Sequence, residues 1–152
     1  MIIRYNGGIN PERVYPYLAK DSGSCRYDTT MNAAYVPGGS RNITAGDEDE
    51  LLRAVAFEGP VAIGYQAAEG FRDYTGGVYN GTGICNSTAD SVNHAVVVVG
   101  FNHEDINGTS VNYWIIKNSW GEDWGERGYF NMVRGVNMCG IAECASYPSM
   151  WG

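Results

Sequence analysis

The chain has 152 residues, a formal net charge of −7, and 44% hydrophobic and 12% aromatic residues. It can bury a globular core, but it lacks the basic face that nucleic-acid binding needs. Its longest apolar run is too short to cross a bilayer, so we expect no membrane partner. The 21 glycines and 11 tyrosines favour a loop-rich β structure over a helical bundle.

The first forty residues carry weak signals of regular structure. Residues 1–5 are typical of the end of a helix, which Asn6-Gly7-Gly8 would stop. Pro16 favours an extended conformation at Tyr15. Residues 18–40 predict loop, with one short strand near 33–36.

A helix is predicted to begin at Asp47 and to end at Gly59-Pro60. Asp47 and Glu50 have the spacing of a capping box, and the acidic run 47–50 suits the positive end of the helix dipole. The predicted apolar face consists of Leu51, Leu52, Val55 and Ala56.

Strands are predicted at 61–65, 94–101, 111–117, 128–134 and 141–147. A helical turn at 71–74 and an extended segment at 77–79 separate the first two strands. Four consecutive valines, 96–99, predict a strand buried on both faces. Segment 102–112, with His103, is predicted to be an exposed hairpin loop. This order predicts an α+β fold, a partly open antiparallel β-barrel with one packed helix.

A histidine and an asparagine stand at the ends of two of these runs. His94 opens one strand, and Asn118 follows another. An imidazole that transfers protons in a fixed direction needs a hydrogen-bond partner on its other ring nitrogen. An asparagine oxygen can be that partner without adding charge. Taken singly, a histidine on a strand is more often structural, and Asn118 could merely form a turn.

Four asparagines stand in N-x-S/T sequons, which favours passage through the secretory pathway. These glycosylation candidates are Asn42, Asn80, Asn86 and Asn107. The four cysteines point the same way if they pair. The cysteines and histidines show no C-x-x-C or H-x-x-x-H spacing, so we expect no metal and no cofactor.

Several long motifs together resemble one protein family. They are G-G-I-N-P-E-R-V-Y-P-Y, E-G-P-V-A-I, N-H-A-V-V-V-V-G-F, Y-W-I-I-K-N-S-W-G-E-D-W-G-E-R-G-Y and M-C-G-I-A. This set resembles the papain family of cysteine peptidases, nearest the cathepsin L-like branch. The family's Q-x-x-x-x-x-C-G-S-C-W stretch, with its nucleophile and oxyanion-hole glutamine, does not occur here. The chain therefore resembles a C-terminal part, with residues 1–40 as a remnant of the helical domain and 41–152 as the β-barrel domain.

The resemblance also implies roles for individual residues. His94 would be the general acid and base, and Asn118 would orient its ring. Trp120 would cover their hydrogen bond, and Trp124 would line the leaving-group side of the cleft. Val92 and Asn93 would line the cleft beside substrate. Implied partners are polypeptide substrates, the missing helical domain, a pro-segment and cystatin-like inhibitors, in a lysosomal or extracellular location.

The resemblance pairs Cys85 with Cys139 in a disulfide and leaves Cys25 without its upstream partner. Gly23-Ser24-Cys25 echoes the nucleophile motif. However, Cys25 precedes His94 by only 69 residues, against roughly 130–150 in the family. That spacing predicts a nucleophile roughly 35–55 residues before Met1.

Cys144 occupies the position that the resemblance assigns to the floor of the second specificity pocket. A small, weakly polar floor would favour Leu, Phe or Val in the substrate. The alternative is that Cys144 is simply a buried strand cysteine, and the sequence leaves both open.

Three interpretations are consistent with these residues and with the family resemblance. In the first, we expect the chain to be the C-terminal part of a papain-like cysteine endopeptidase, inactive alone, with its nucleophile upstream. The alternative is a non-catalytic binding or regulatory homologue derived from the family. A processed two-chain enzyme is a third possibility.

Overall fold

The computed structural model describes residues 7–149, so the helix end predicted at 1–5 lies outside the described residues. These residues fall into two compact units, 7–41 with 148–149, and 42–147. The smaller unit consists mainly of turns. The strand predicted near 33–36 is wrong, because the structure has a single bridge there, between Ile9 and Ala34.

The predicted helix is present as α2, Glu48–Phe57. Asp47 is its N-cap and accepts a hydrogen bond from the Glu50 N–H at 2.7 Å. The Glu50 carboxylate does not complete the capping box, because it accepts from the Thr44 N–H at 2.8 Å instead. The apolar face is also shifted: Ala54 is buried with Leu51 and Val55, whereas Ala56 is exposed.

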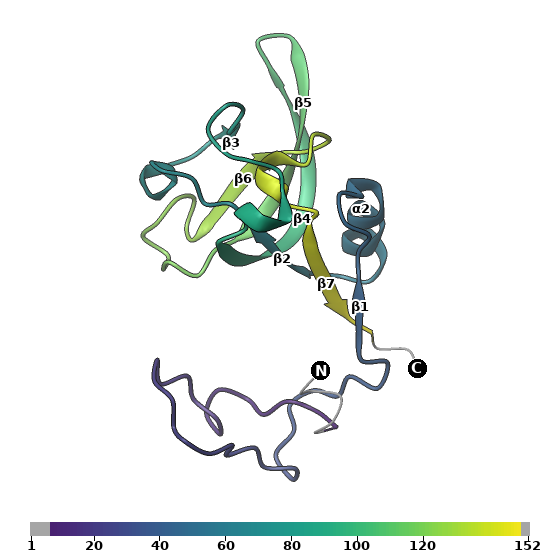
Figure 1. Cartoon of the computed structure of the whole chain (residues 1–152), viewed down its shortest axis with the longest axis vertical. Helices are drawn as coiled ribbons and strands as arrows, with labels where there is room; N and C mark the ends of the chain where they lie inside the picture. The colour runs from purple at the N-terminus through teal and green to yellow at the C-terminus, as the bar shows by residue number, and fades with distance from the viewer. Residues whose placement is uncertain (1–6, 150–152) are drawn as a thin grey trace. The chain divides into compact units, whose positions relative to one another are not determined.

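The larger unit is built on a sheet with α2 beside β2 and β4 (Figure 1). The strands are β1 Ser40–Asn42, β2 Val61–Tyr65, β3 Val78–Tyr79, β4 His94–Ile106, β5 Thr109–Lys117, β6 Tyr129–Val133 and β7 Cys144–Pro148. Their order is β1-β7-β2-β4-β5-β6-β3, which leaves the sheet open rather than closed into a barrel. β3 runs parallel to β6, whereas β7, β2, β4, β5 and β6 pair antiparallel.

Three short 3₁₀ helices connect the strands: η1 Phe71–Asp73, η2 Ala89–Ser91 and η3 Met138–Gly140. The strand predicted at 141–147 begins only at Cys144, because Cys139 and Gly140 turn the chain with positive φ angles. The predicted hairpin loop 102–112 is instead paired strand. β4 and β5 continue to a two-residue turn at Asn107-Gly108, where both φ angles are positive. The hairpin projects beyond the rest of the sheet (Figure 1).

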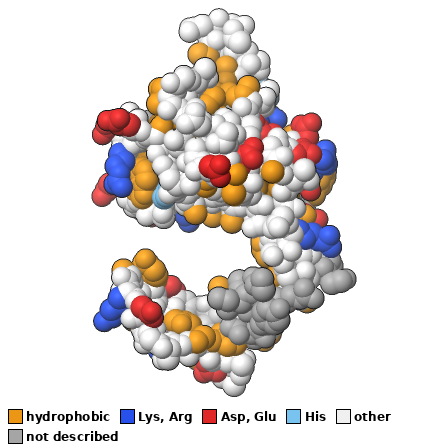
Figure 2. Space-filling view, in the orientation of Figure 1, with side chains coloured by type: hydrophobic (Ala, Val, Ile, Leu, Met, Phe, Trp, Pro, Cys, Tyr) orange, Lys and Arg blue, Asp and Glu red, His pale blue; other side chains and the backbone are white. Residues whose placement is uncertain are grey.

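The expectation that 96–99 is buried on both faces is wrong. Val96 and Val98 are buried, but Val97 is half-buried and Val99 is 37% exposed. The alternation is that of an antiparallel strand with one covered face, which a run of valines cannot reveal. Figure 2 shows hydrophobic side chains at the surface of this unit, between scattered acidic ones.

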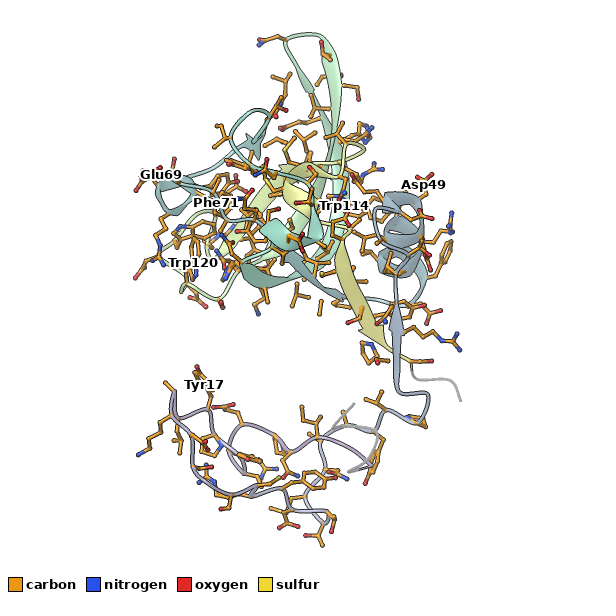
Figure 3. All side chains as sticks on the ribbon, in the orientation of Figure 1. Tyr17, Asp49, Glu69, Phe71, Trp114 and Trp120 are labelled. Carbon is orange, nitrogen blue, oxygen red and sulfur yellow. A yellow bond between two sulfur atoms is a disulfide. The ribbon has the colours of Figure 1, made fainter. Side chains whose placement is uncertain are left out.

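Trp114 lies on the α2 side of the unit, and Phe71 and Trp120 lie together at the opposite side (Figure 3). Trp114 is fully buried, and its indole N–H donates to the Glu48 carboxylate at 2.9 Å. Glu48 also accepts from the backbone N–H groups of Gly135, at 2.8 Å, and of Asn137. One carboxylate in the first turn of α2 therefore joins the helix to β5 and to the segment after β6.

We expect Glu48→Ala to lower the free energy of unfolding by about 2–3 kcal/mol, because it leaves three donors without their charged acceptor. The neighbouring Asp49 is exposed and serves as a matched control. Asp49→Ala should change stability by no more than about 0.5 kcal/mol. Urea unfolding followed by tryptophan fluorescence measures both, and equal effects would contradict the special role of Glu48.

Candidate active site

The pairing of β4 with β5 brings His94 and Asn118 to the same place. His94 is the first residue of β4 and lies opposite Tyr65 of β2. Asn118 directly follows β5, whose last residue, Lys117, pairs with Val97. In an antiparallel pair the start of one strand lies beside the end of the next. His94 and Asn118, which are 24 residues apart in the sequence, therefore become neighbours through strand pairing.

The Asn118 side-chain oxygen joins the two residues. Its Oδ1 lies 3.0 Å from His94 Nε2 and accepts the Ser119 backbone N–H at 2.8 Å. A backbone N–H can only donate, so the amide must present oxygen, not nitrogen, on this side. An oxygen acceptor in turn requires the proton to sit on Nε2. The geometry therefore selects the imidazole tautomer in which Nδ1 carries the free lone pair.

An aromatic cluster surrounds this hydrogen bond. The Trp120 ring stacks on His94, with centroids 4.9 Å apart and planes 28° apart. Trp124 meets Trp120 edge-on at 4.9 Å, and Phe71 contacts both tryptophans at 6.0 and 5.6 Å. The Trp124 indole N–H donates to the Arg72 carbonyl oxygen at 2.8 Å, which attaches the cluster to η1. Such contacts limit rotation of the His94 ring and the access of water to its bond with Asn118.

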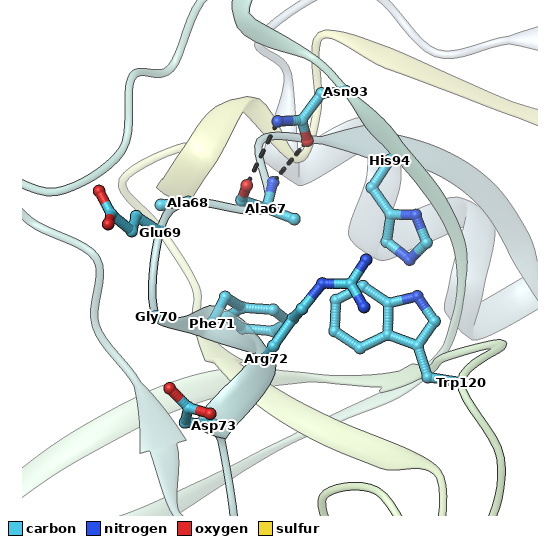
Figure 4. Close-up of a pocket in the computed structure, with 10 residues that line it drawn as sticks. All are labelled: Ala67, Ala68, Glu69, Gly70, Phe71, Arg72, Asp73, Asn93, His94 and Trp120. Atoms are coloured by element: carbon cyan, nitrogen blue, oxygen red, sulfur yellow. Dashed lines mark hydrogen bonds between the residues drawn. The ribbon is translucent and has the colours of Figure 1, made fainter.

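Asn93 holds the loop before η1 beside His94. Its side-chain Oδ1 accepts the Ala67 N–H at 2.8 Å, and its Nδ2 donates to the Ala67 carbonyl at 3.2 Å (Figure 4). A pocket of about 590 Å³ lies between this loop, His94 and Trp120. Its lining contains no cysteine among the described residues. No role of this loop was predicted from the sequence, in which A-A-E-G-F-R follows the end of β2 after one residue.

Val92 and Cys144 lie at a different place from this pocket, around Gly64 of β2. A Cβ atom built on Gly64 would come within 2.6 Å of Val92 Cγ1 and 3.4 Å of Cys144 Cβ. The absence of a side chain at Gly64 therefore lets Val92 and Cys144 pack directly against the backbone of β2. Cys144 is a free, exposed thiol, so the alternative of a buried strand cysteine is wrong.

The family model described as papain family cysteine protease matches residues 1–149. This match covers nearly the whole chain, including His94, Asn118 and Trp120. The chain belongs to the papain family. The sequence resemblance is thereby confirmed at the level of the family.

Curated relatives include pro-cathepsin H of Medicago truncatula, 51% identical, and the thiol protease aleurain of Arabidopsis thaliana, 49% identical. Each match covers 96% of this chain but only 40% and 39% of the relative. The chain thus spans about two fifths of the length of these curated relatives.

Solved structures in the family have the same fold. Digestive procathepsin L 3 of Tenebrio molitor larval midgut matches with a TM-score of 0.83 and 40% identity, over 97% of this chain and 47% of that one. The bromelain protease of Ananas comosus matches with a TM-score of 0.82 and 35% identity, over 99% and 66%. These neighbours confirm the papain-like α+β fold that the sequence predicted.

The disulfide that the family resemblance implies is present between Cys85 and Cys139. Gly81 packs against it, since a Cβ there would approach the two sulfur atoms within 2.6 and 3.0 Å. Closing a loop across 54 residues stabilises the fold by about 4 kcal/mol in the chain-entropy account. Cys25, in the smaller unit, is free and exposed.

The four sequon asparagines, Asn42, Asn80, Asn86 and Asn107, are all exposed. Within the described residues, no group of three or more Cys, His, Asp or Glu side chains could hold a metal ion. A search of the same residues for a helix long and apolar enough to cross a membrane also found none.

Tyr65 lies against His94, with ring centroids 5.7 Å apart. Its hydroxyl is buried and has no hydrogen-bond partner among the described residues. Burial raises the pKa of this hydroxyl above its ordinary value, and the nearby Tyr79 adds to the rise, so the ring stays neutral. In contrast, the Tyr74 hydroxyl donates to the Gly77 carbonyl at 2.6 Å and accepts the Asn131 N–H at 3.1 Å.

We therefore expect opposite effects from removing these two hydroxyl groups. Tyr65→Phe should leave the free energy of unfolding unchanged or raise it by up to about 1 kcal/mol, because it removes an unpaired buried polar group. Tyr74→Phe should lower it by about 1 kcal/mol, because it breaks two hydrogen bonds. Denaturant unfolding of both variants measures the difference. A loss of stability in Tyr65→Phe as large as in Tyr74→Phe would contradict this account.

Proposed function

We propose that the chain is the part of a papain-like cysteine endopeptidase that carries its general acid and base. The nucleophilic cysteine and the oxyanion-hole glutamine are supplied by a helical domain that precedes this chain in the whole protein. The observation that carries the proposal is the linked pair of hydrogen bonds from Ser119 N–H and His94 Nε2 to Asn118 Oδ1. This arrangement leaves His94 Nδ1 free to exchange a proton with a thiol.

The reaction then follows from the tautomer. His94 Nδ1 takes the thiol proton, and the resulting thiolate attacks the scissile carbonyl carbon. The tetrahedral oxyanion collapses, the C–N bond breaks, and the imidazolium gives its proton to the leaving amine. Water attacks the thioester while Nδ1 accepts its proton, and the acid product departs with restoration of the thiolate and imidazolium. Asn118 keeps the ring in one orientation through both steps.

Acyl-side specificity is assigned to the surface around Gly64. Val92 and Cys144 border it, and neither brings a charge. An uncharged surface of this kind suits Leu, Phe or Val of the substrate and offers nothing to pair with Arg. The proposal thus predicts an endopeptidase with an apolar preference at its second specificity pocket.

The same proposal covers maturation and location. The names pro-cathepsin and procathepsin among the relatives support a pro-segment that precedes the mature enzyme. The exposed sequons support glycosylation in the secretory pathway, and with it a lysosomal or extracellular site of action. Cystatin-like proteins are the inhibitors that the papain family resemblance implies.

The proposal is tested on the protein from its natural source, using an epoxide probe for papain-like thiols. We expect a labelled species that carries sequence before Met1 and is modified at a cysteine some tens of residues upstream. Mass spectrometry of the labelled peptide identifies the site. An unlabelled protein that begins at Met1 would contradict the proposal and would favour the non-catalytic homologue.

Variants of the labelled enzyme test the roles of the two residues. His94→Ala should lower kcat/KM at least about 100-fold, the lower range for loss of a general acid and base. Asn118→Ala should lower it by about 10- to 100-fold, because the imidazole remains but its orientation is lost. Asn112→Ala, an exposed asparagine on β5, is the matched control and should leave kcat/KM unchanged. Full activity in Asn118→Ala would contradict the orienting role.

A further inference from the structure

The pocket beside His94 contains a cation that the proposed catalysis does not use. Arg72 belongs to η1 and lines this pocket with His94 and Trp120. Its guanidinium carbon lies 5.1 Å from the centroid of the Trp120 ring, a cation–π contact. Figure 4 shows the side chain extending across the pocket towards Trp120 and His94. The charge therefore stands next to the group that donates the proton to the leaving amine.

The base of Arg72 is fixed, whereas its charged end is free to bind. Its carbonyl oxygen accepts the Trp124 indole N–H at 2.8 Å, and the preceding Phe71 is only 2% exposed. Among the residues that the structure describes, no carboxylate forms an ion pair with its guanidinium. A guanidinium stacked on a ring still presents its N–H donors at its edges, in a geometry that matches a carboxylate.

Two carboxylates also line the pocket, those of Glu69 and Asp73. Figure 4 shows both pointing away from His94, across the pocket from Trp120. Arg72 is therefore the charged side chain directed to the place where the leaving group must pass. In a chain with a net charge of −7, this local positive charge favours anionic groups at one position rather than over the whole surface.

We propose that Arg72 is a specificity residue that binds a carboxylate on the leaving-group side of the scissile bond. This inference rests on the proposed function, because the leaving amine must accept its proton from His94 and so begins beside this pocket. Gly64, Val92 and Cys144, which form the proposed acyl-side surface, do not line the pocket beside His94. The carboxylate comes either from an acidic side chain in the first two leaving-group residues or from the free end of a short leaving peptide.

The test uses the enzyme at its natural length and quenched peptides with one common acyl side. The two peptides of the first pair have an amidated C-terminus and differ in carrying Glu or Gln on the leaving-group side. The two peptides of the second pair differ only in having a free or an amidated C-terminus. We expect kcat/KM to favour the carboxylate by about fivefold, the size of an exposed ion pair, and less at high salt. The pair that shows the preference identifies the source of the carboxylate.

Substitutions then assign the preference to its residue. Arg72→Gln should abolish it, and Arg72→Lys should keep part of it, because a cation remains. Arg53→Gln removes an exposed arginine of α2, outside the pocket, and should leave the preference intact. Equal preferences in wild type and Arg72→Gln, with peptides still cleaved, would overturn the inference and leave the proposed function standing.

Failure to cleave any peptide would count against the proposed function instead. In that case, a binding measurement tests whether Arg72 recognises a carboxylate. NMR titration with the dipeptides Ala-Glu and Ala-Gln needs no nucleophile. The Trp120 indole N–H signal, assigned by its loss in Trp120→Phe, should shift more with Ala-Glu than with Ala-Gln. That difference should vanish in Arg72→Gln, and equal shifts from both dipeptides would overturn the inference.

Discussion

The site depends on one amide oxygen that accepts two hydrogen bonds. Ser119 N–H and His94 Nε2 both point at Asn118 Oδ1, at 2.8 and 3.0 Å. The orientation has a cost, because the Asn118 Nδ2 atom is buried without a partner among the described residues. An unpaired buried donor costs about 1–3 kcal/mol. The fold tolerates this loss at the position where the imidazole tautomer is decided.

The rest of the larger unit holds that oxygen in place. The Asn118 backbone N–H donates to Gly128 at 2.9 Å, so its Cα position does not depend on the side chain. The aromatic cluster packs on His94 through Trp120, and Phe71 joins the cluster to the buried Phe130. The Cys85–Cys139 disulfide fixes the segment before β4 to η3, and Cys139 in turn accepts the Gln66 N–H at 2.8 Å. The surroundings of the histidine are therefore attached to the core through Phe71 and through the disulfide.

The sequence could predict the elements whose signals are local. The N-cap at Asp47, the strand at 61–65 and the turn at 71–74 all follow from capping, alternation and glycine positions. The predictions from sequence were wrong where contacts with residues distant in the sequence determine the local structure. Burial of Val97 and Val99 depends on which face of β4 is covered, and the Asn107-Gly108 turn lets β4 and β5 pair through a segment that composition marks as loop.

The candidate site divides in the same way. His94, Asn118 and Trp120 stand in motifs long enough to be recognised, and the structure brings all three together. Arg72 belongs to no such motif, and only the turn of η1 directs it into the pocket. The Ser119 N–H could not be noticed as a feature of the sequence, because every residue except proline has one. Its role appears only once the backbone after β5 is placed.

The use of asparagine rather than aspartate follows from the same geometry. Asn118 is 8% exposed, and a carboxylate there would bring a buried negative charge into a chain that already carries −7. A carboxylate would also stabilise the charged imidazolium more strongly than a neutral amide does. A neutral oxygen fixes the tautomer without adding a charge. Three consecutive residues therefore supply the acceptor, the backbone donor that orients it, and, in Trp120, the ring that covers the bond.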